Sequence, residues 1–242
     1  MELIEAIKIR HSVRNFTDEP VAQEIIYGLK SLAEQYNQSA GLHIQIITDD
    51  PEAFTKGMAH YGKFSGVRNY IALVGGKTRN LEEKLGYFGE KMALSLTQQD
   101  IQFCWVGLTF SKKTNRVEVG KGEKYVGVIC FGHGTSRGIS HKIKAREEVM
   151  EAENAPQWFL DGVDAALLAP TAMNQQKFIF ILKPDGKVDA KSGHGLFADV
   201  DLGIAKYHFE IGAGRPAVSV RQHTTANDEK VRTYGNVKLF LR

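Results

Sequence analysis

The segment Arg10-His11-Ser12-Val13-Arg14 places two arginines around a serine, between a short amphipathic stretch and the start of a helix. Alternate side chains of an extended segment point the same way, so Arg10, Ser12 and Arg14 are expected to share one side. Arginine donates bidentate, charge-assisted hydrogen bonds to phosphate, and a hydroxyl adds another polar group. The segment therefore predicts an anion site, and the alternative interpretation is a solvated basic turn.

Two other stretches combine with this one. Downstream lies Ala169-Pro170-Thr171-Ala172-Met173-Asn174-Gln175-Gln176, and between the two lies Gly86-Tyr87-Phe88-Gly89-Glu90-Lys91-Met92, which leads to Cys104-Trp105-Val106-Gly107. Together with the start at Arg10–Phe16, they resemble the nitroreductase family of flavin enzymes. In that family an Arg-x-Ser-x-Arg motif holds the phosphate and ribityl chain of FMN. Each match is weak alone, but three matches spread over most of the chain are fairly specific.

The composition is that of an ordinary globular protein. The 242 residues are 43% hydrophobic and 24% charged, which suffices for a sizeable core. The net charge of +3 is too small to indicate nucleic-acid binding by itself. Cys104 and Cys130 each lie in an apolar run, so we expect buried free thiols, with no disulfide framework and no metal-ligand spacing.

The N-terminal residues bear on location. Glu2, Glu5 and Lys8 stand where a signal peptide needs an apolar core. No run approaches the roughly 20 apolar residues that a membrane helix requires. We therefore expect a cytoplasmic, reduced protein that does not bind membranes.

Hydrophobic periodicity predicts alternating helices and strands, and hence an α+β fold. A first helix is expected to be capped by Thr17 or Asp18, with Pro20 in its first turn. The other predicted helices are Leu81–Gln98, Pro156–Leu168 and Asp201–Ile211. The predicted strands are His43–Ile47, Tyr70–Val74, Phe103–Val106, Tyr125–Phe131, Phe178–Leu182 and Val237–Leu241. The family resemblance implies a mixed β-sheet sandwiched by helices.

The order of elements suggests an internal repeat. Helix Ile25–Tyr36 followed by strand His43–Ile47 is similar to helix Phe159–Leu168 followed by strand Phe178–Leu182. The helix after Gly89 has a weaker counterpart after Gly203. The alternative is that any α+β chain shows helix, loop and strand twice.

The resemblance gives this repeat a meaning. Ordinary nitroreductases are homodimers that hold each FMN between two subunits, and a Pro-Ser-x-x-Asn-x-Gln segment follows soon after their Arg-x-Ser-x-Arg motif. Here the stretch 35–41 lacks the Pro-Ser-x-x-Asn-x-Gln pattern, and the second half lacks an Arg-x-Ser-x-Arg motif. The resemblance therefore implies a fused pseudo-dimer with an internal pseudo-two-fold, residues 1–150 forming one half and 151–242 the other. The resemblance further implies one composite flavin site and a protein that is able to work as a monomer.

The resemblance also assigns contacts to FMN. Arg10, Ser12 and Arg14 would bind the phosphate and ribityl hydroxyls, and His11 stands where many relatives carry another arginine. From the basic run 141–146, Lys144 and Arg146 would close over the phosphate, unless they simply face water.

The flavin ring would meet two other segments. Asn174 can both donate and accept a hydrogen bond, which suits the mixed edge of an isoalloxazine, with Thr171 and Gln176 in support. The remaining contacts on this segment are expected from Pro170, Ala172 and Met173. Trp105, Val106 and Gly107 would cross the flavin face, where a glycine lets backbone N–H groups approach closely. The alternative interpretation of segment 170–176 is a polar loop after a helix, and that of Trp105 is an ordinary core side chain.

No catalytic triad, metal cluster or paired carboxylates stand out, so no catalytic side chain is assigned. The family reading explains this, because FMN would carry hydride from NADH or NADPH to a nitro, quinone or similar acceptor. The segments 58–66 and 112–124 could shape the substrate mouth. Two alternatives remain: an FMN storage or sensing module, and, more remotely, a basic domain that binds nucleic acid or protein.

Overall fold

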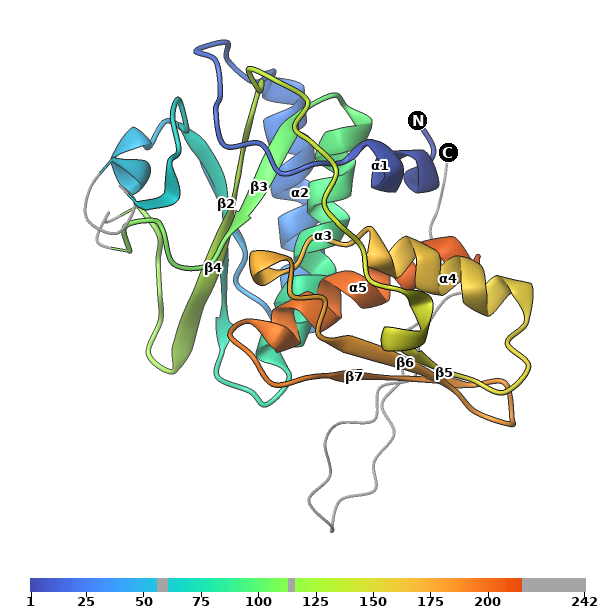
Figure 1. Cartoon of the computed structure of the whole chain (residues 1–242). Coiled ribbons are helices and arrows are strands. Elements are labelled where there is room, and N and C mark those ends of the chain that lie inside the picture. The colour runs from blue at the N-terminus through green and yellow to red at the C-terminus, as the bar shows by residue number, and fades with distance from the viewer. Residues whose placement is uncertain (56–60, 113–115, 215–242) are drawn as a thin grey trace.

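The computed structural model describes residues 1–55, 61–112 and 116–214, so the predicted strand Val237–Leu241 lies outside the described residues. Within those residues the chain forms an α+β fold with two β-sheets and a set of helices between and beside them (Figure 1). The α+β class predicted from the sequence is therefore confirmed. The single mixed sheet implied by the resemblance is replaced by two separate sheets.

The first sheet is antiparallel and has the strand order β1-β2-β4-β3. Its strands are β1 (Gln45–Ile47), β2 (Asn69–Gly76), β3 (Gln102–Val106) and β4 (Glu123–Gly132). Strands β2 and β4 pair from Asn69 opposite Phe131 to Gly76 opposite Glu123, with a bulge at Leu73 and Val74. Most residues of the two central strands are buried, which explains why they read as continuous apolar runs in the sequence.

The second sheet has the order β5-β6-β7, with β5 (Met150–Glu151), β6 (Phe178–Leu182) and β7 (Val188–Ser192). The β5–β6 pairing is parallel and the β6–β7 pairing is antiparallel. Strand β7 was not predicted, because its sequence VDAKS offers few apolar residues. Its buried Asp189 is paired with Lys183 across the hairpin at 3.2 Å.

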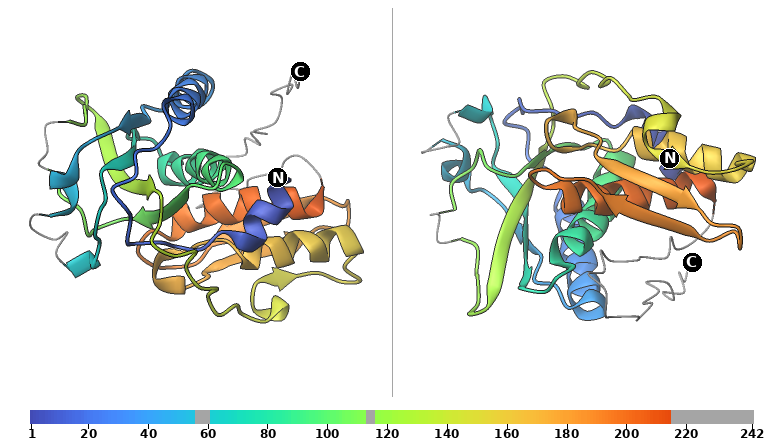
Figure 2. Two further views of the ribbon diagram at one scale, coloured as in Figure 1. Left: turned by 90° about the horizontal axis from the view of Figure 1, so that it is seen from above. Right: turned by 60° about the horizontal axis from the view of Figure 1, so that its bottom comes forward.

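Two helices form the centre of the molecule. They are α3 (Leu81–Gln98), which packs on the first sheet, and α5 (Ala198–Ala213), which packs on β6, β7 and α4 (Gln157–Leu167). Helix α2 (Gln23–Ala40) lies beside α3, and α1 (Leu3–Ile9) contacts α3 and α5 (Figure 2). The short 3₁₀ helices are η1 (Pro51–Phe54), η3 (Arg146–Glu148) and η4 (Ala172–Asn174).

Helices α3 and α5 approach each other at two glycines. A Cβ on Gly86 would lie 2.1 Å from the carbonyl oxygen of Val200, and one on Gly203 would lie 2.0 Å from that of Glu83. Each glycine thus faces the carbonyl three residues before the other. The contact is reciprocal, and Gly86 is the residue of α3 that matches Gly203 of α5. The repeat expected from the sequence instead paired Gly89 with Gly203.

The segment before α2 differs from the sequence-based expectation. The helix begins at Gln23 with Ala22 as its N-cap, so neither Thr17 nor Asp18 caps it. Instead the Thr17 amide donates to the carbonyl of His133 at 2.8 Å, which fastens this segment to the end of β4. Pro20 reinforces the extended conformation, because a proline disfavours helical geometry in the residue before it.

Other boundaries agree closely with the sequence. Helix Leu81–Gln98 and strand Phe178–Leu182 have the predicted limits, and α4 and α5 lie within three residues of theirs. None of the described helices combines the length and apolar character needed to cross a lipid bilayer.

Candidate functional site

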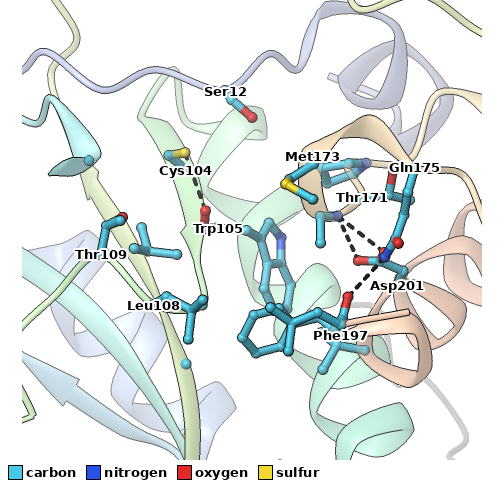
Figure 3. Close-up of a pocket in the computed structure, with 18 of the residues that line it drawn as sticks. Ser12, Cys104, Trp105, Leu108, Thr109, Thr171, Met173, Gln175, Phe197 and Asp201 are labelled. Carbon is cyan, nitrogen blue, oxygen red and sulfur yellow. Dashed lines mark hydrogen bonds between the residues drawn. The ribbon is translucent and has the colours of Figure 1, made fainter. Parts of the chain in front are cut away.

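A cavity of about 640 Å³ opens where the first sheet faces the η4 loop and the first turns of α5. Figure 3 shows Trp105 standing in it, with Cys104 and Leu108 on one side and Thr171 and Phe197 on the other. Of the predicted site residues, the structure brings together on its wall Ser12, Arg14, Trp105, Val106, Gly107, Pro170, Thr171, Ala172 and Met173. Ser12 and Arg14, segment 105–107 and segment 170–173 therefore meet at one cavity.

The Arg10–Arg14 segment reaches the cavity by running beside β3. Val13 donates its N–H to the Phe103 carbonyl at 3.0 Å, and its side chain is buried in the core. Ser12 and Arg14, on either side of it, line the cavity. The alternation predicted for these two residues is thus observed.

Arg10 does not line the cavity. Its guanidinium is 4% exposed, donates from Nη2 to the Leu168 carbonyl at 3.5 Å and lies 5.9 Å from the centre of the Phe103 ring. Its Nε and Nη1 are buried and have no hydrogen-bond partner. Burial lowers the pKa of this guanidinium, while the charge of Glu90 opposes the effect. A buried donor left unpaired in this way is what an anion could satisfy.

Trp105 is held by fully buried polar groups. Its indole Nε1 donates to Glu90 Oε2 at 2.8 Å, and Glu90 Oε1 lies 2.8 Å from Nε2 of His208. Nδ1 of His208 lies 3.1 Å from the carbonyl of Ala165, which can only accept, so this nitrogen carries a proton. Both α3 and α5 therefore fix the orientation of a ring that stands in the cavity.

The turn after β3 is shaped by an aromatic ring. A Cβ on Gly107 would lie 2.3 Å from the ring of Phe197, so a glycine is needed for that ring to pack here. Phe197 itself has a φ of 61° and stands directly before α5. The group that approaches Gly107 closely in this structure is Phe197, and the approach of the Gly107 backbone N–H to a flavin stays a prediction.

The η4 loop turns through a sequence of left-handed residues. Met173, Asn174 and Gln176 have φ values of 51°, 54° and 45°. As a result Asn174 is exposed and its Nδ2 donates to the Lys142 carbonyl at 2.8 Å, while Gln176 Nε2 donates to Asn174 Oδ1 at 2.8 Å. Neither amide lines the cavity here, because both fasten the loop to the basic segment, and their contact with a flavin stays a prediction.

The basic segment also differs from the expectation. The backbone N–H of Lys144 donates to Gln176 Oε1, and its ammonium donates to the Gln176 carbonyl at 3.1 Å. Arg146 forms a bidentate ion pair with Asp164 at 2.5 and 2.6 Å. Neither cation lines the cavity, since both are engaged by nearby partners. His11 is half-buried and also lies outside the cavity wall, and burial lowers its pKa.

Sequence reasoning missed Asp201, which lines the cavity from α5. Its Oδ1 and Oδ2 accept from the Ala172 N–H at 2.9 and 3.1 Å, and Oδ2 also accepts from Gln175 Nε2 at 2.7 Å (Figure 3). The carboxyl is 2% exposed, and burial raises the pKa of Asp201 to about 6. A carboxyl between Val200 and Leu202, two buried apolar residues, is the signal that could have pointed to it.

Other wall residues were foreseen only by position. Segment 61–64, part of the predicted mouth, does line the cavity, whereas no described residue of 112–124 does. The further wall residues that sequence reasoning missed include Thr109, Gln175, Lys177, Leu196 and Phe197.

Comparison with known proteins places this arrangement in a family. Residues 2–213 match the family model described as "Putative TM nitroreductase". The chain therefore belongs to this family of nitroreductase-type oxidoreductases. No curated protein matches the sequence.

Two solved structures share the fold. A nitroreductase-like protein from Thermotoga maritima is 21% identical, with a TM-score of 0.69 over 93% of this chain and 91% of its own. A protein from Desulfovibrio desulfuricans, described as a nitroreductase in complex with FMN, is 19% identical, with a TM-score of 0.50. The second alignment covers 98% of that protein but 63% of this chain.

Proposed function

We propose that this protein is an FMN-dependent oxidoreductase that passes hydride from NADH or NADPH to a nitro, quinone or similar acceptor. The observation that carries the proposal is the meeting of Ser12 and Arg14 with the 170–173 loop around one cavity of about 640 Å³. That volume lies in the range of pockets that enclose a cofactor-sized ligand, ~300–1,000 Å³. The FMN complex of the Desulfovibrio protein, which shares the fold, supports the choice of flavin.

The residues present fit such a group. Ser12 and Arg14 offer a hydroxyl and a cation to phosphate or ribityl oxygens. Apolar walls from Val106, Trp105 and the start of α5 suit a flat aromatic ring.

Bound FMN would supply the hydride chemistry, which no side chain can perform. The protein's part is to bind the anionic chain, to keep Trp105 fixed through Glu90, and to exclude water by covering the cavity with Phe197 and the η4 loop.

We further propose one such site per chain, formed by two fused nitroreductase-like halves. The reciprocal contact of Gly86 and Gly203 supports this, because a contact that exchanges equivalent residues is typical of an isologous, two-fold interface. Strand β5 lies across the proposed boundary at residue 150. The alignment of one whole FMN-bound relative with 63% of this chain is also consistent with a longer, fused molecule.

Binding of FMN tests the proposal directly. Replacing Arg14 with Ala should weaken FMN binding by about 10- to 100-fold, because a charge-assisted hydrogen bond is lost. Arg146→Ala is the matched control, since this arginine pairs with Asp164 outside the cavity and should leave the affinity unchanged. Quenching of flavin fluorescence measures both. Equal affinities for wild type and Arg14→Ala would contradict the assignment of this segment.

Reduction by nucleotide separates an enzyme from a storage module. Under anaerobic conditions NADH or NADPH should bleach the bound flavin, and a quinone should restore its absorbance. A protein that binds FMN and stays oxidised with both nucleotides would be a binding module instead.

A further inference from the structure

Among the described residues on the cavity wall, one carboxyl is present, that of Asp201. The other ionisable side chains on this wall are Arg14, Tyr61, Lys63, Cys104 and Lys177. Asp201 lies in the first turn of α5, beside the η4 loop and opposite the side of the cavity formed by Cys104 and Leu108 (Figure 3). It is therefore placed among the groups that would surround a bound ring.

The contacts of this carboxyl leave part of it available. The Ala172 N–H and the Gln175 amide are its two donors, and an ionised carboxyl offers about four acceptor positions. When the carboxyl is protonated, its O–H becomes a donor. The two nitrogens beside it are donors themselves and cannot accept this proton. The proton must then be directed to another acceptor, and the cavity is the neighbouring space.

The surroundings of Asp201 raise the pKa of its carboxyl. Burial is the main cause that raises its pKa, to about 6, and the Gln175 and Ala172 hydrogen bonds oppose it. The charged groups on neighbouring elements are engaged elsewhere: Lys177 with the His194 carbonyl, Lys206 with Glu83, and Asp199 with Ser192. A carboxyl with a pKa near the working pH is suited to general acid and base catalysis.

We propose that Asp201 is the catalytic acid that protonates the acceptor in the cavity. This inference rests on the proposed function and adds a role that the flavin alone does not fill. The acceptor is a flat, largely apolar molecule with a quinone or nitro oxygen, because Leu196, Phe197, Val200 and Ile204 form an apolar wall beside the carboxyl.

Bound FMN would supply the acceptor with two electrons and one proton as a hydride, which would leave a negative charge on an acceptor oxygen. The Asp201 O–H bond breaks, its proton forms the new O–H bond of the acceptor, and the electron pair stays on the carboxylate. The Ala172 N–H and the Gln175 amide stabilise that carboxylate, and solvent returns the proton before the next turnover.

The competing explanation is a purely structural latch. Asp201 fastens the η4 loop to α5 through Ala172 and Gln175, so its loss could act only by loosening the loop. Asp201→Asn removes the proton and keeps the side-chain size, and Asp199→Asn is the control. Asp199 is exposed, belongs to the same helix turn and hydrogen-bonds Ser192 outside the cavity.

The experiment has three measurements on wild type, Asp201→Asn and Asp199→Asn. The first is FMN affinity by fluorescence quenching. The second is the pKa of Asp201, from the ¹³C chemical shift of labelled aspartate in the flavin-free protein. The third is the rate at which benzoquinone reoxidises the reduced protein, followed by stopped-flow absorbance across the pH range around 6, the pKa that burial gives this carboxyl.

The proposal expects the ¹³C titration of Asp201 and an inflection of the wild-type reoxidation rate at the same pH, with slower reaction on the alkaline side. Asp201→Asn should bind FMN with near wild-type affinity, lose the inflection and react about 10²–10⁴-fold more slowly. Asp199→Asn should behave as wild type.

Two results would overturn the role of Asp201 alone. One is a wild-type rate that does not change with pH across the titration of this carboxyl. The other is an Asp201→Asn protein that binds FMN poorly yet reoxidises at the wild-type rate once loaded, as a latch requires. Wild type that binds no FMN would instead refute the proposed function, so the two failures are distinguishable.

Discussion

Trp105 stands in the cavity because two buried residues hold its indole there. Glu90 and His208 are both 0% exposed, and Glu90 bridges the tryptophan to the histidine. A buried ionisable pair contributes little to stability against apolar replacements, but removing one partner alone costs about 3–5 kcal/mol. The pair therefore serves orientation more than stability, because it connects α3 and α5 to the ring of Trp105.

Asp201 should make stability depend on pH. Its pKa in the folded protein is about 6, against about 3.9 in the unfolded chain, so the folded state binds its proton more tightly. The stabilisation is fully present below about pH 4 and is lost as the pH rises through 6, a difference of about 3 kcal/mol in the free energy of unfolding. Urea unfolding of wild type and Asp201→Asn at several pH values measures it. A difference between the two that stays constant with pH would contradict the shift.

Single residues also show where sequence reasoning succeeds and fails. Ser12 and Arg14 line the cavity together, as strand alternation predicts, because alternation is a local property that five residues express. Lys144, Arg146 and Asn174 do not line it, because each has a partner distant in sequence: Gln176, Asp164 and the Lys142 carbonyl. The pairings of Lys144 and Asn174 depend on the left-handed residues of the η4 loop, and no hydrophobic pattern encodes them.

At the scale of elements, long periodic segments were predictable and weakly patterned ones were not. The limits of α3 were predicted because Leu81, Leu85 and Met92, all buried, repeat at helical spacing. Strand β7 was missed since its buried Asp189 depends on Lys183, a tertiary contact. The start of α2 was misplaced because the Thr17–His133 hydrogen bond, which lies between distant segments, holds the preceding residues extended.

The crossing of α3 and α5 gives a test at this scale. Gly86→Ala should destabilise the fold by about 1–3 kcal/mol or more, because its Cβ would lie 2.1 Å from the Val200 carbonyl and force the helices apart. Gly28→Ala is the matched control: it is also in a helix, a Cβ there meets nothing within 4 Å, and it should stabilise by roughly 0.5–1 kcal/mol through helix propensity. Chemical denaturation measures both. Equal changes in the two variants would show that the close approach is not a packing constraint.

At the scale of the whole molecule, residues far apart in the sequence contribute different parts of one cavity. Residues 1–150 supply Ser12, Arg14 and Trp105, and later residues supply the η4 loop and Asp201. A homodimer of ordinary subunits would generate two equivalent sites by symmetry, whereas a fused chain needs to keep only one. The sequence suggested this from motifs that each occur once, and the Gly86–Gly203 contact supplies a structural reason for the same proposal.

The proposed fused arrangement predicts the mass of the protein and the number of FMN molecules it binds. Because both contributors to the site belong to one chain, no second copy is needed to complete it, and the protein should bind one FMN per chain as a monomer of 26.9 kDa. Multi-angle light scattering gives the mass, and flavin absorbance after denaturation gives the number of FMN molecules per chain. If the protein is a dimer, mixing Arg14→Ala with Asp201→Asn subunits distinguishes the cases. A site shared between subunits would recombine a wild-type cavity in such a mixture, whereas a site within each chain would leave every cavity carrying one of the two substitutions.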